Sequence, residues 1–326
     1  MIRLAYCSLL ALAGCPAKKT TPQSLGAGCP SAANVYIATY VKQEQGHGRS
    51  GWVVPLHATT ELGDIGSYTN IDPTTAGAAG TPVAPSGTLW LATASAPPCR
   101  ATLGKYYAAK IDGPPASATY GVEVEGCPPP KGSDEGEGGG FILVSEQSPG
   151  GCRFEAPRPI AARVGVMNAN KQWQKPTKET PIPEPIAATL PAKECAAPAC
   201  EKLWAFLDVK IDNKTVAWSG VVNWLRVDAA AEQCTWKSDR ESGIWIPTNG
   251  GAVKVTEGQE HPLPMSAVLA DGDGAKVILA EGPGDYATYD LAAGRAKLGH
   301  RIKWQVFPAD VWDQVDNVGP FCEPKR

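Results

Sequence analysis

Cys152 stands in a stretch whose residue types could form a nucleophilic site, SPGGCRF at residues 148–154. A cysteine attacks as the thiolate, and a catalytic thiolate needs a base within hydrogen-bond reach. Histidine is the usual base, but the sequence holds no histidine between His57 and His261. A base for Cys152 would therefore have to come from a distant part of the chain.

This stretch resembles the Ser-His-Gly-Cys-x-Arg signature of the L,D-transpeptidases, which crosslink peptidoglycan. In that family the cysteine is the nucleophile and a histidine lies close to it. Here Pro149 and Gly150 stand where the signature has His-Gly. The resemblance implies an envelope hydrolase or peptidoglycan transpeptidase as an alternative function. The competing interpretation places Cys152 in a disulfide, and we assign no catalytic residue.

A second candidate site is the stretch DGDG at residues 271–274, which resembles the acidic start of a calcium loop. Calcium takes six to eight oxygen ligands. The stretch offers Asp271 and Asp273 and then runs into the apolar AKVILA, with no Glu placed to close the site. Asp271 and Asp273 are thus the candidate metal ligands, a tight hairpin turn is the competing interpretation, and no cofactor is expected.

The N-terminus indicates where the protein is placed. Arg3, the apolar run 4–12 and the small residues Ala13 and Gly14 have the layout of a secretory signal. The stretch LAGC at residues 12–15 resembles the lipobox of bacterial lipoproteins. The resemblance implies cleavage before Cys15, lipid on its thiol, and anchoring in the cell envelope, with the outer membrane favoured because no Asp follows Cys15. An ordinary signal peptide is the competing interpretation.

The remaining cysteines predict disulfides. The chain has 10 cysteines, of which Cys7 leaves with the signal and Cys15 takes the lipid. An even set in an exported chain is typical of a disulfide framework, whereas a zinc site would need a second pair with metal spacing besides Cys195 and Cys200. The disulfide candidates are Cys29, Cys99, Cys127, Cys152, Cys195, Cys200, Cys234 and Cys322.

The elements that would position these residues are strands. The chain has 35 Gly and 30 Pro, and short apolar runs such as 34–41, 118–126 and 140–146 alternate with turn residues. This pattern predicts an all-β protein with two antiparallel sandwich or barrel-like domains stabilised by disulfides. The predicted divisions are a signal at 1–14, a tether at 15–30, β domain 1 at 31–167, a Pro-rich linker at 168–194 and β domain 2 at 195–326.

The two halves also share an ordered series of matches. CRATLGKYYAAKID at 99–112 resembles CEKLWAFLDVKID at 200–212, and both continue to a Gly-Val pair and a further cysteine. An internal duplication would explain the series, and chance similarity between two β-rich segments is the alternative.

Trp218 and Trp224 are the candidate binding residues. They lie an even number of residues apart, so in one regular strand they would share a face. An exposed tryptophan face stacks on sugars or anchors a protein partner, while a buried one fills a β core. A glycan-binding module is therefore a further alternative function.

The charge balance favours some partners over others. The formal net charge is −3, and no basic stripe is present that would favour nucleic acid. We expect a non-enzymatic cell-envelope lipoprotein that is held to the membrane by its N-terminal lipid. Its expected role is to bind a protein or glycan partner, or to serve as an assembly component.

Overall fold

The computed structural model describes most of the chain between residues 28 and 305, and the structural statements below concern these residues. Cys15, the predicted signal and most of the tether lie outside them, as do Cys234, Cys322 and Asp273. The described ranges are 28–41, 50–60, 67–74, 84–94, 96–111, 116–130, 138–163, 166–167, 173–174, 179–195, 200–228, 235–256, 263–272, 274–282, 284–292 and 294–305.

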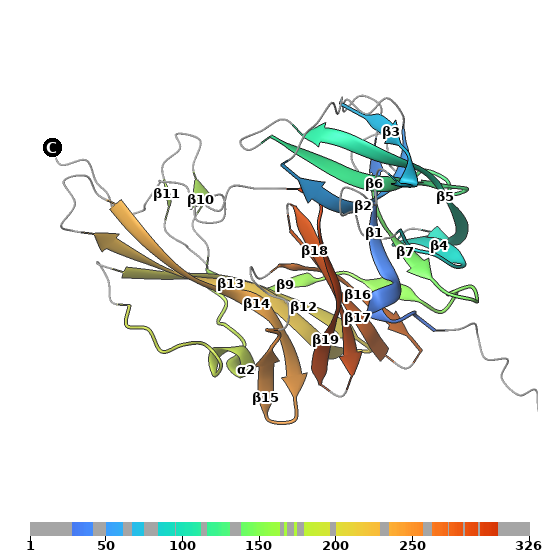
Figure 1. The fold of residues 1–326 in the computed structure, drawn as a ribbon. Coiled ribbons are helices and arrows are strands. Elements are labelled where there is room, and N and C mark those ends of the chain that lie inside the picture. Colours follow the sequence, from blue (N-terminus) through green and yellow to red (C-terminus); the bar gives the residue numbers. More distant parts are fainter. Residues whose placement is uncertain are drawn as a thin grey trace, which may run out of the picture.

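Six antiparallel strands from the first half of the chain close into a barrel (Figure 1). Closure occurs because β5 pairs with β4 along one edge and with β6 along the other. A short outer strand, β3 (Thr69–Ile71), also pairs with β5. In sheet order the barrel strands are β5 (Ala96–Ile111), β4 (Leu89–Thr93), β7 (Gly138–Val144), β1 (Val35–Val41), β2 (Gly51–Thr59) and β6 (Ser117–Glu125).

The barrel is filled from the alternate positions of its strands. Val122 and Val124 of β6 belong to the same buried cluster as Trp52 and Val54 of β2. Because successive side chains of a strand point to opposite faces, the residues between them lie on the outside of the barrel. Pro55, which cannot donate to the ladder, stands where the register between β2 and β6 shifts.

Two five-stranded antiparallel sheets form a sandwich beside the barrel (Figure 1). We call them the long sheet and the short sheet. The long sheet has the order β15 (Gly251–Lys254), β14 (Thr235–Thr248), β13 (Lys214–Asp228), β12 (Cys200–Ile211) and β9 (Arg158–Arg163). The short sheet has the order β19 (Arg295–Lys303), β18 (Asp285–Ala292), β17 (Gly274–Glu281), β16 (Met265–Asp271) and β8 (Arg153–Glu155).

The faces that the two sheets turn toward each other are apolar. Val209 and Ile244 of the long sheet are fully or almost fully buried in one cluster with Val268, Ile278 and Tyr289 of the short sheet. Burial of these side chains is the main stabilising term for such a sandwich. The all-β prediction, with sandwich and barrel-like bodies, is therefore confirmed.

The chain passes from barrel to sandwich earlier than the predicted domain boundary at residue 167. Both β8 and β9 fall inside the predicted first domain, yet they pair with β16 and β12 of the sandwich. The predicted linker begins after β9 and ends before β12, and these two strands are neighbours in one sheet. A short pair, β10 (Val166–Met167) with β11 (Trp173–Gln174), lies between them in sequence.

The last part of the predicted linker, together with Cys195, packs on the long sheet. Residues 179–195, which we call the strap, include the short helix α2 (Glu184–Ala187). Ile186 of α2 is fully buried in the cluster formed by the outer face of the long sheet. Ile182 and Leu190 pack against the same cluster, so the strap supplies an apolar residue at every fourth position.

Three disulfides are present among the described residues. Cys99 is bonded to Cys127, at the start and end of the β5–β6 hairpin, and Cys195 of the strap is bonded to Cys200 of β12. Cys29, at the start of the described chain, is bonded to Cys152, which precedes β8. The four cysteines before the strap thus bridge among themselves, and no zinc site uses Cys195 and Cys200.

The short 3-10 helix η1 (Ala32–Asn34) lies at the contact between barrel and sandwich, which we call the joint. The backbone N–H of Ala32 donates to Asp290 at 2.7 Å, and its carbonyl accepts from the hydroxyl of Thr288 at 2.8 Å. A Cβ on Gly299 would come within 2.6 Å of Ala32, so only glycine permits this approach. The ring of His300 stacks on that of Tyr36 from the barrel.

The two matched segments of the suspected duplication form similar hairpins with different continuations. β5 leads into β6 as β12 leads into β13. After that, β14 pairs with β13, whereas β7 pairs with β1 and β4. The cysteine partners also differ, because Cys99 is joined across its own hairpin and Cys200 to the strap. The likeness is thus limited to one hairpin in each half.

Candidate functional site

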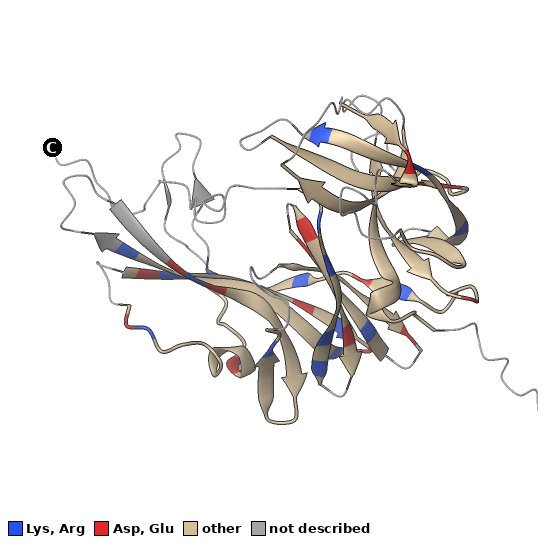
Figure 2. Cartoon of the chain, viewed as in Figure 1, with Lys and Arg blue, Asp and Glu red and all other residues tan. Residues whose placement is uncertain are grey.

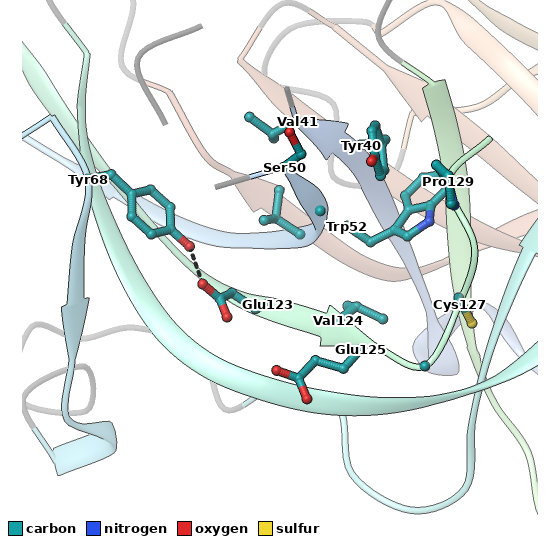
Figure 3. A pocket seen from close by; sticks show the side chains of 13 residues that line it. Tyr40, Val41, Ser50, Trp52, Tyr68, Glu123, Val124, Glu125, Cys127 and Pro129 are labelled. Atoms are coloured by element: carbon teal, nitrogen blue, oxygen red, sulfur yellow. Dashed lines mark hydrogen bonds between the residues drawn. The ribbon is translucent and has the colours of Figure 1, made fainter. Parts of the chain in front are cut away.

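A pocket opens at the rim of the barrel, where β1 ends, β2 begins and β6 ends (Figure 3). Its volume is about 390 Å³. We call it the rim pocket. It is lined by Tyr40, Val41, Ser50, Gly51, Trp52, Val53, Tyr68, Glu123, Val124, Glu125, Gly126, Cys127 and Pro129.

One side of the rim pocket is acidic. Glu123 and Glu125 are two residues apart on β6, so both carboxylates lie on the outer face of the barrel while Val124 between them enters the core. Figure 3 shows both carboxylates on the side where Tyr68 stands. The hydroxyl of Tyr68 donates to Oε1 of Glu123 at 2.6 Å, which is the length of a strong hydrogen bond to a carboxylate.

Tyr107 lies behind this acidic side. Its ring stacks on Tyr68 with 5.2 Å between centroids, and a Cβ on Gly121 would come within 2.5 Å of its hydroxyl oxygen. Burial raises the pKa of Tyr107 well above its ordinary value, and the charge of Glu123 raises it further. Tyr107 therefore stays a neutral phenol behind the acidic side.

The opposite side of the rim pocket is apolar and fixed. Trp52 is 2% exposed, and its indole N–H donates to the carbonyl of Pro128 at 2.8 Å. Tyr40 meets the Trp52 ring edge-on at 5.4 Å, a favourable geometry for aromatic pairs. Pro129 completes this wall (Figure 3).

Two backbone features place that wall. Gly126 has φ of +88°, a conformation that glycine adopts without strain, and it turns the chain as β6 ends. The next residue, Cys127, is bonded to Cys99 of β5. The turn and the disulfide together hold the segment that contains Pro128 and Pro129 over the rim.

The rim pocket offers polar groups and aromatic rings that could contact a ligand. Its described lining offers two carboxylates, phenol and serine hydroxyls and aromatic rings, and it includes no Lys, Arg, His or free thiol. Ser50 contributes the aliphatic hydroxyl. Carboxylates and ring faces attract cationic and hydrogen-bond-donating groups.

The transpeptidase-like stretch does not form a nucleophilic site. Cys152 is bonded to Cys29 and is almost fully buried. A sulfur in a disulfide has no thiolate to attack with. The stretch therefore resembles the L,D-transpeptidase signature but lacks the free thiol on which that chemistry depends.

Trp218 and Trp224 share a face, but that face is buried. Trp224 is 1% exposed and Trp218 8%, because the strap covers the outer face of the long sheet. The indole N–H of Trp204 donates to the strap carbonyl of Thr180 at 2.9 Å. The indole N–H of Trp245 donates to the Thr189 hydroxyl at 3.0 Å. Trp218 and Trp224 thus do not offer an exposed binding surface, since both are buried in the cluster that the strap covers.

The strap is also fixed by charge. Lys193 pairs with Asp239 at 2.6 Å, and its ammonium nitrogen lies 4.6 Å from the centre of the Trp224 ring. Arg226 donates to the carbonyl of Glu194 at 3.3 Å. Next to these contacts the Cys195–Cys200 disulfide ties the end of the strap to β12.

The stretch DGDG lies where β16 ends at Asp271 and β17 begins at Gly274. Asp271 pairs with Gly274 across the hairpin, and Gly274 has φ of +113°. Asp271 is paired at 3.8 Å with Lys276. Its partner in the metal prediction, Asp273, lies outside the described residues. Over the parts of the chain that the structure does describe, no group of three His, Cys, Asp or Glu side chains is placed to hold a metal ion.

The rim residues were not singled out from the sequence. The stretch VEVE at 122–125 does carry a signal, since alternation of Val and Glu puts two carboxylates on one face of a strand. No such pattern marks Tyr68 or Trp52 in the sequence. Trp52 lies near the start of β2 and Tyr68 just before β3, and both lie at the pocket because of how these strands pair with others.

Comparison with protein-family models, with curated proteins and with solved structures found no match for this chain. Within the residues that the structure describes, no helix has the length and apolar character required to cross a membrane.

Proposed function

We propose that this chain is a lipid-anchored, non-enzymatic protein of the bacterial cell envelope, held by Cys15 in the outer membrane. Its role is to bind a partner or a ligand, and the rim pocket is the site of binding. The observation that carries the proposal is the set of three disulfides, since disulfides persist in exported proteins and are rare in the cytosol.

The position of the first disulfide fits a tethered protein. Cys29 follows Cys15 by 14 residues, and it is bonded to Cys152, which directly precedes β8 of the sandwich. A chain of that length reaches at most about 50 Å when fully extended. The folded body would therefore stay close to the membrane with freedom to turn.

The rim pocket would face away from the anchor. Val35 at the start of β1 packs in the cluster that contains Cys29 and Cys152, whereas Tyr40 and Val41 at its end line the pocket. A strand of seven residues separates the two by about 20 Å. This orientation supports binding of a partner from the aqueous side.

The charge distribution supports a protein or glycan partner rather than nucleic acid. Among the described residues in Figure 2, Lys and Arg side chains are interspersed with Asp and Glu over both bodies. Nucleic-acid binding is favoured instead by a continuous basic face. The rim pocket itself carries two carboxylates, which would repel phosphates.

Labelling with a fatty acid tests the anchor. Cells of a Gram-negative host that express the chain are grown with an alkyne fatty acid, and the label is read on the purified protein. We expect label in the wild type and none in Cys15→Ala, with Cys7→Ala as the matched control that keeps the label. Absence of label from the wild type, or equal label in Cys15→Ala, would overturn the proposal.

A further inference from the structure

We propose that the rim pocket binds a protonated primary amine carried on an aliphatic chain, as in an alkylamine or a lysine-type side chain. This inference rests on the proposed function, because it names the ligand class of the same pocket. It follows from the two unlike sides of the pocket, one acidic and one apolar.

The acidic side provides for the ammonium group. Glu123 is 5% exposed and Glu125 is exposed, so the first carboxylate forms the floor of this side and the second its edge. An ammonium group donates three hydrogen bonds, and carboxylates are its strongest acceptors.

The apolar side provides for the chain that carries the amine. Tyr40 and Pro129 stand across the pocket from the two carboxylates, next to the 2% exposed Trp52 (Figure 3). The edge-on contact and the indole hydrogen bond hold the rings of Tyr40 and Trp52 in place. When the methylene groups of the ligand pack against these rings, they are removed from water and no hydrogen bond is broken, which favours binding.

The acidic and apolar sides together favour a primary alkylammonium over a quaternary ammonium and over a neutral sugar. A quaternary ammonium has no N–H to donate, so it would leave the carboxylates without hydrogen bonds from the ligand. A neutral sugar would bond to the carboxylates but gain no charge attraction. A primary ammonium on an alkyl chain uses both sides of the pocket.

Tyr68 is a positioning residue in this arrangement. Its hydroxyl orients Glu123, while its ring is stacked on Tyr107 and so cannot turn away. The structure therefore presents the carboxylate of Glu123 in one orientation before the ligand arrives, which lowers the entropy cost of binding.

The test titrates the folded, full-length mature chain with pentylamine and, in parallel, with 1-pentanol. Both probes have the same alkyl chain, and only pentylamine is positively charged at pH 7. The readouts are the heat of binding and the NMR shift of the Trp52 indole N–H, assigned by its loss in Trp52→Phe. Nα-acetyl-lysine amide, titrated in the same way, shows whether a peptide side chain is accepted as well as a free amine.

We expect pentylamine to bind at least tenfold more tightly than 1-pentanol and to shift the Trp52 signal. Glu123→Gln should weaken pentylamine binding about 10- to 100-fold, the value of a hydrogen bond to a charged group. Glu125→Gln is the second variant, and it is exposed enough to leave folding intact. Glu146→Gln, an exposed carboxylate after β7, is the matched control and should bind as the wild type does.

Equal binding of pentylamine and 1-pentanol, or unchanged pentylamine binding in both Glu123→Gln and Glu125→Gln, would overturn the amine inference while leaving a binding pocket in place. No shift of the Trp52 signal by any of the three probes would also overturn it. Failure of the fatty acid labelling would overturn the proposed function instead, so the two failures are distinguishable.

Discussion

The disulfide between Cys29 and Cys152 should be the most stabilising of the three bridges, and this can be tested by removing it. The two cysteines are 123 residues apart, and the loop that they close contains the entire barrel. Both lie in the buried cluster at the joint, together with Leu143 of the barrel and Leu269 of the sandwich. The perturbation is the paired variant Cys29→Ser with Cys152→Ser, which removes both thiols of this bridge.

The expected magnitude follows from the size of the loop. A crosslink stabilises mainly by restricting the unfolded chain, and the loop-closure relation gives about 5 kcal/mol for a loop of this length. The Cys195–Cys200 bridge, with a separation of 5, gives only about 2 kcal/mol by the same relation. The paired variant Cys195→Ser with Cys200→Ser is therefore the matched control, since it removes the same kind of bond from a short loop.

The assay is urea unfolding of protein exported into an oxidising compartment, followed by tryptophan fluorescence. We expect the Cys29 and Cys152 variant to unfold at a clearly lower urea concentration than the Cys195 and Cys200 variant. If both variants lose the same free energy of unfolding, or if removing the Cys195–Cys200 bridge costs more than removing Cys29–Cys152, the reasoning from loop length would be refuted.

Three further changes test the packing. Ile186→Ala should cost about 2–4 kcal/mol by leaving a cavity beneath the strap, and it should speed hydrogen exchange of the strap amides. Gly299→Ala should cost about 1–3 kcal/mol in urea unfolding, because its Cβ would press on Ala32. Glu281→Gln should stabilise the protein at pH 7, since burial raises the pKa of Glu281 and stability is lost as pH rises through that pKa. The gain, followed by thermal unfolding, should shrink as the pH falls through the raised pKa of Glu281 and should be lost below the ordinary value of 4.5.

Each of these changes has an outcome that would contradict it. Hydrogen exchange of the strap amides at the wild-type rate in Ile186→Ala would mean that the strap is held without the contacts of the Ile186 side chain. Unchanged stability of Gly299→Ala would mean that the joint has room for a methyl group. A Glu281→Gln variant with the same advantage at pH 4 as at pH 7 would show that ionisation of this carboxyl is not the cause.

The strands that alternate clearly could be predicted from the sequence. The runs 34–41, 118–126 and 140–146 correspond to β1, β6 and β7 within a few residues. Turn chemistry was equally informative, since DGDG forms the β16–β17 hairpin. These features depend on residues close together in the chain, which is where sequence patterns act.

The strap could not be predicted in this way. Its prolines indicate an extended segment without ladder hydrogen bonds, and such composition is typical of linkers. The apolar residues Ile182, Ile186 and Leu190 alternate with those prolines, but their partners are tryptophans of the long sheet. The even spacing of Trp218 and Trp224 correctly predicted that they share a face. Their burial depends on the strap, and the spacing of residues along the chain does not predict where the strap packs.

The rim pocket was missed for a related reason. Tyr68 and Glu123 are 55 residues apart and meet because β3 and β6 both pair with β5. That pairing is set by barrel closure and by bulges, such as the one in β5 between Leu103 and Tyr106. A single sequence gives no register for contacts between distant strands.

Intact-mass spectrometry of the non-reduced protein from the membrane fraction of a Gram-negative host tests the central claim most directly. The account predicts a mature chain that begins at Cys15 and carries acyl groups, and a peptide map that joins Cys29 to Cys152, Cys99 to Cys127 and Cys195 to Cys200. A mature chain without acyl groups, or free thiols at these six positions, would contradict it.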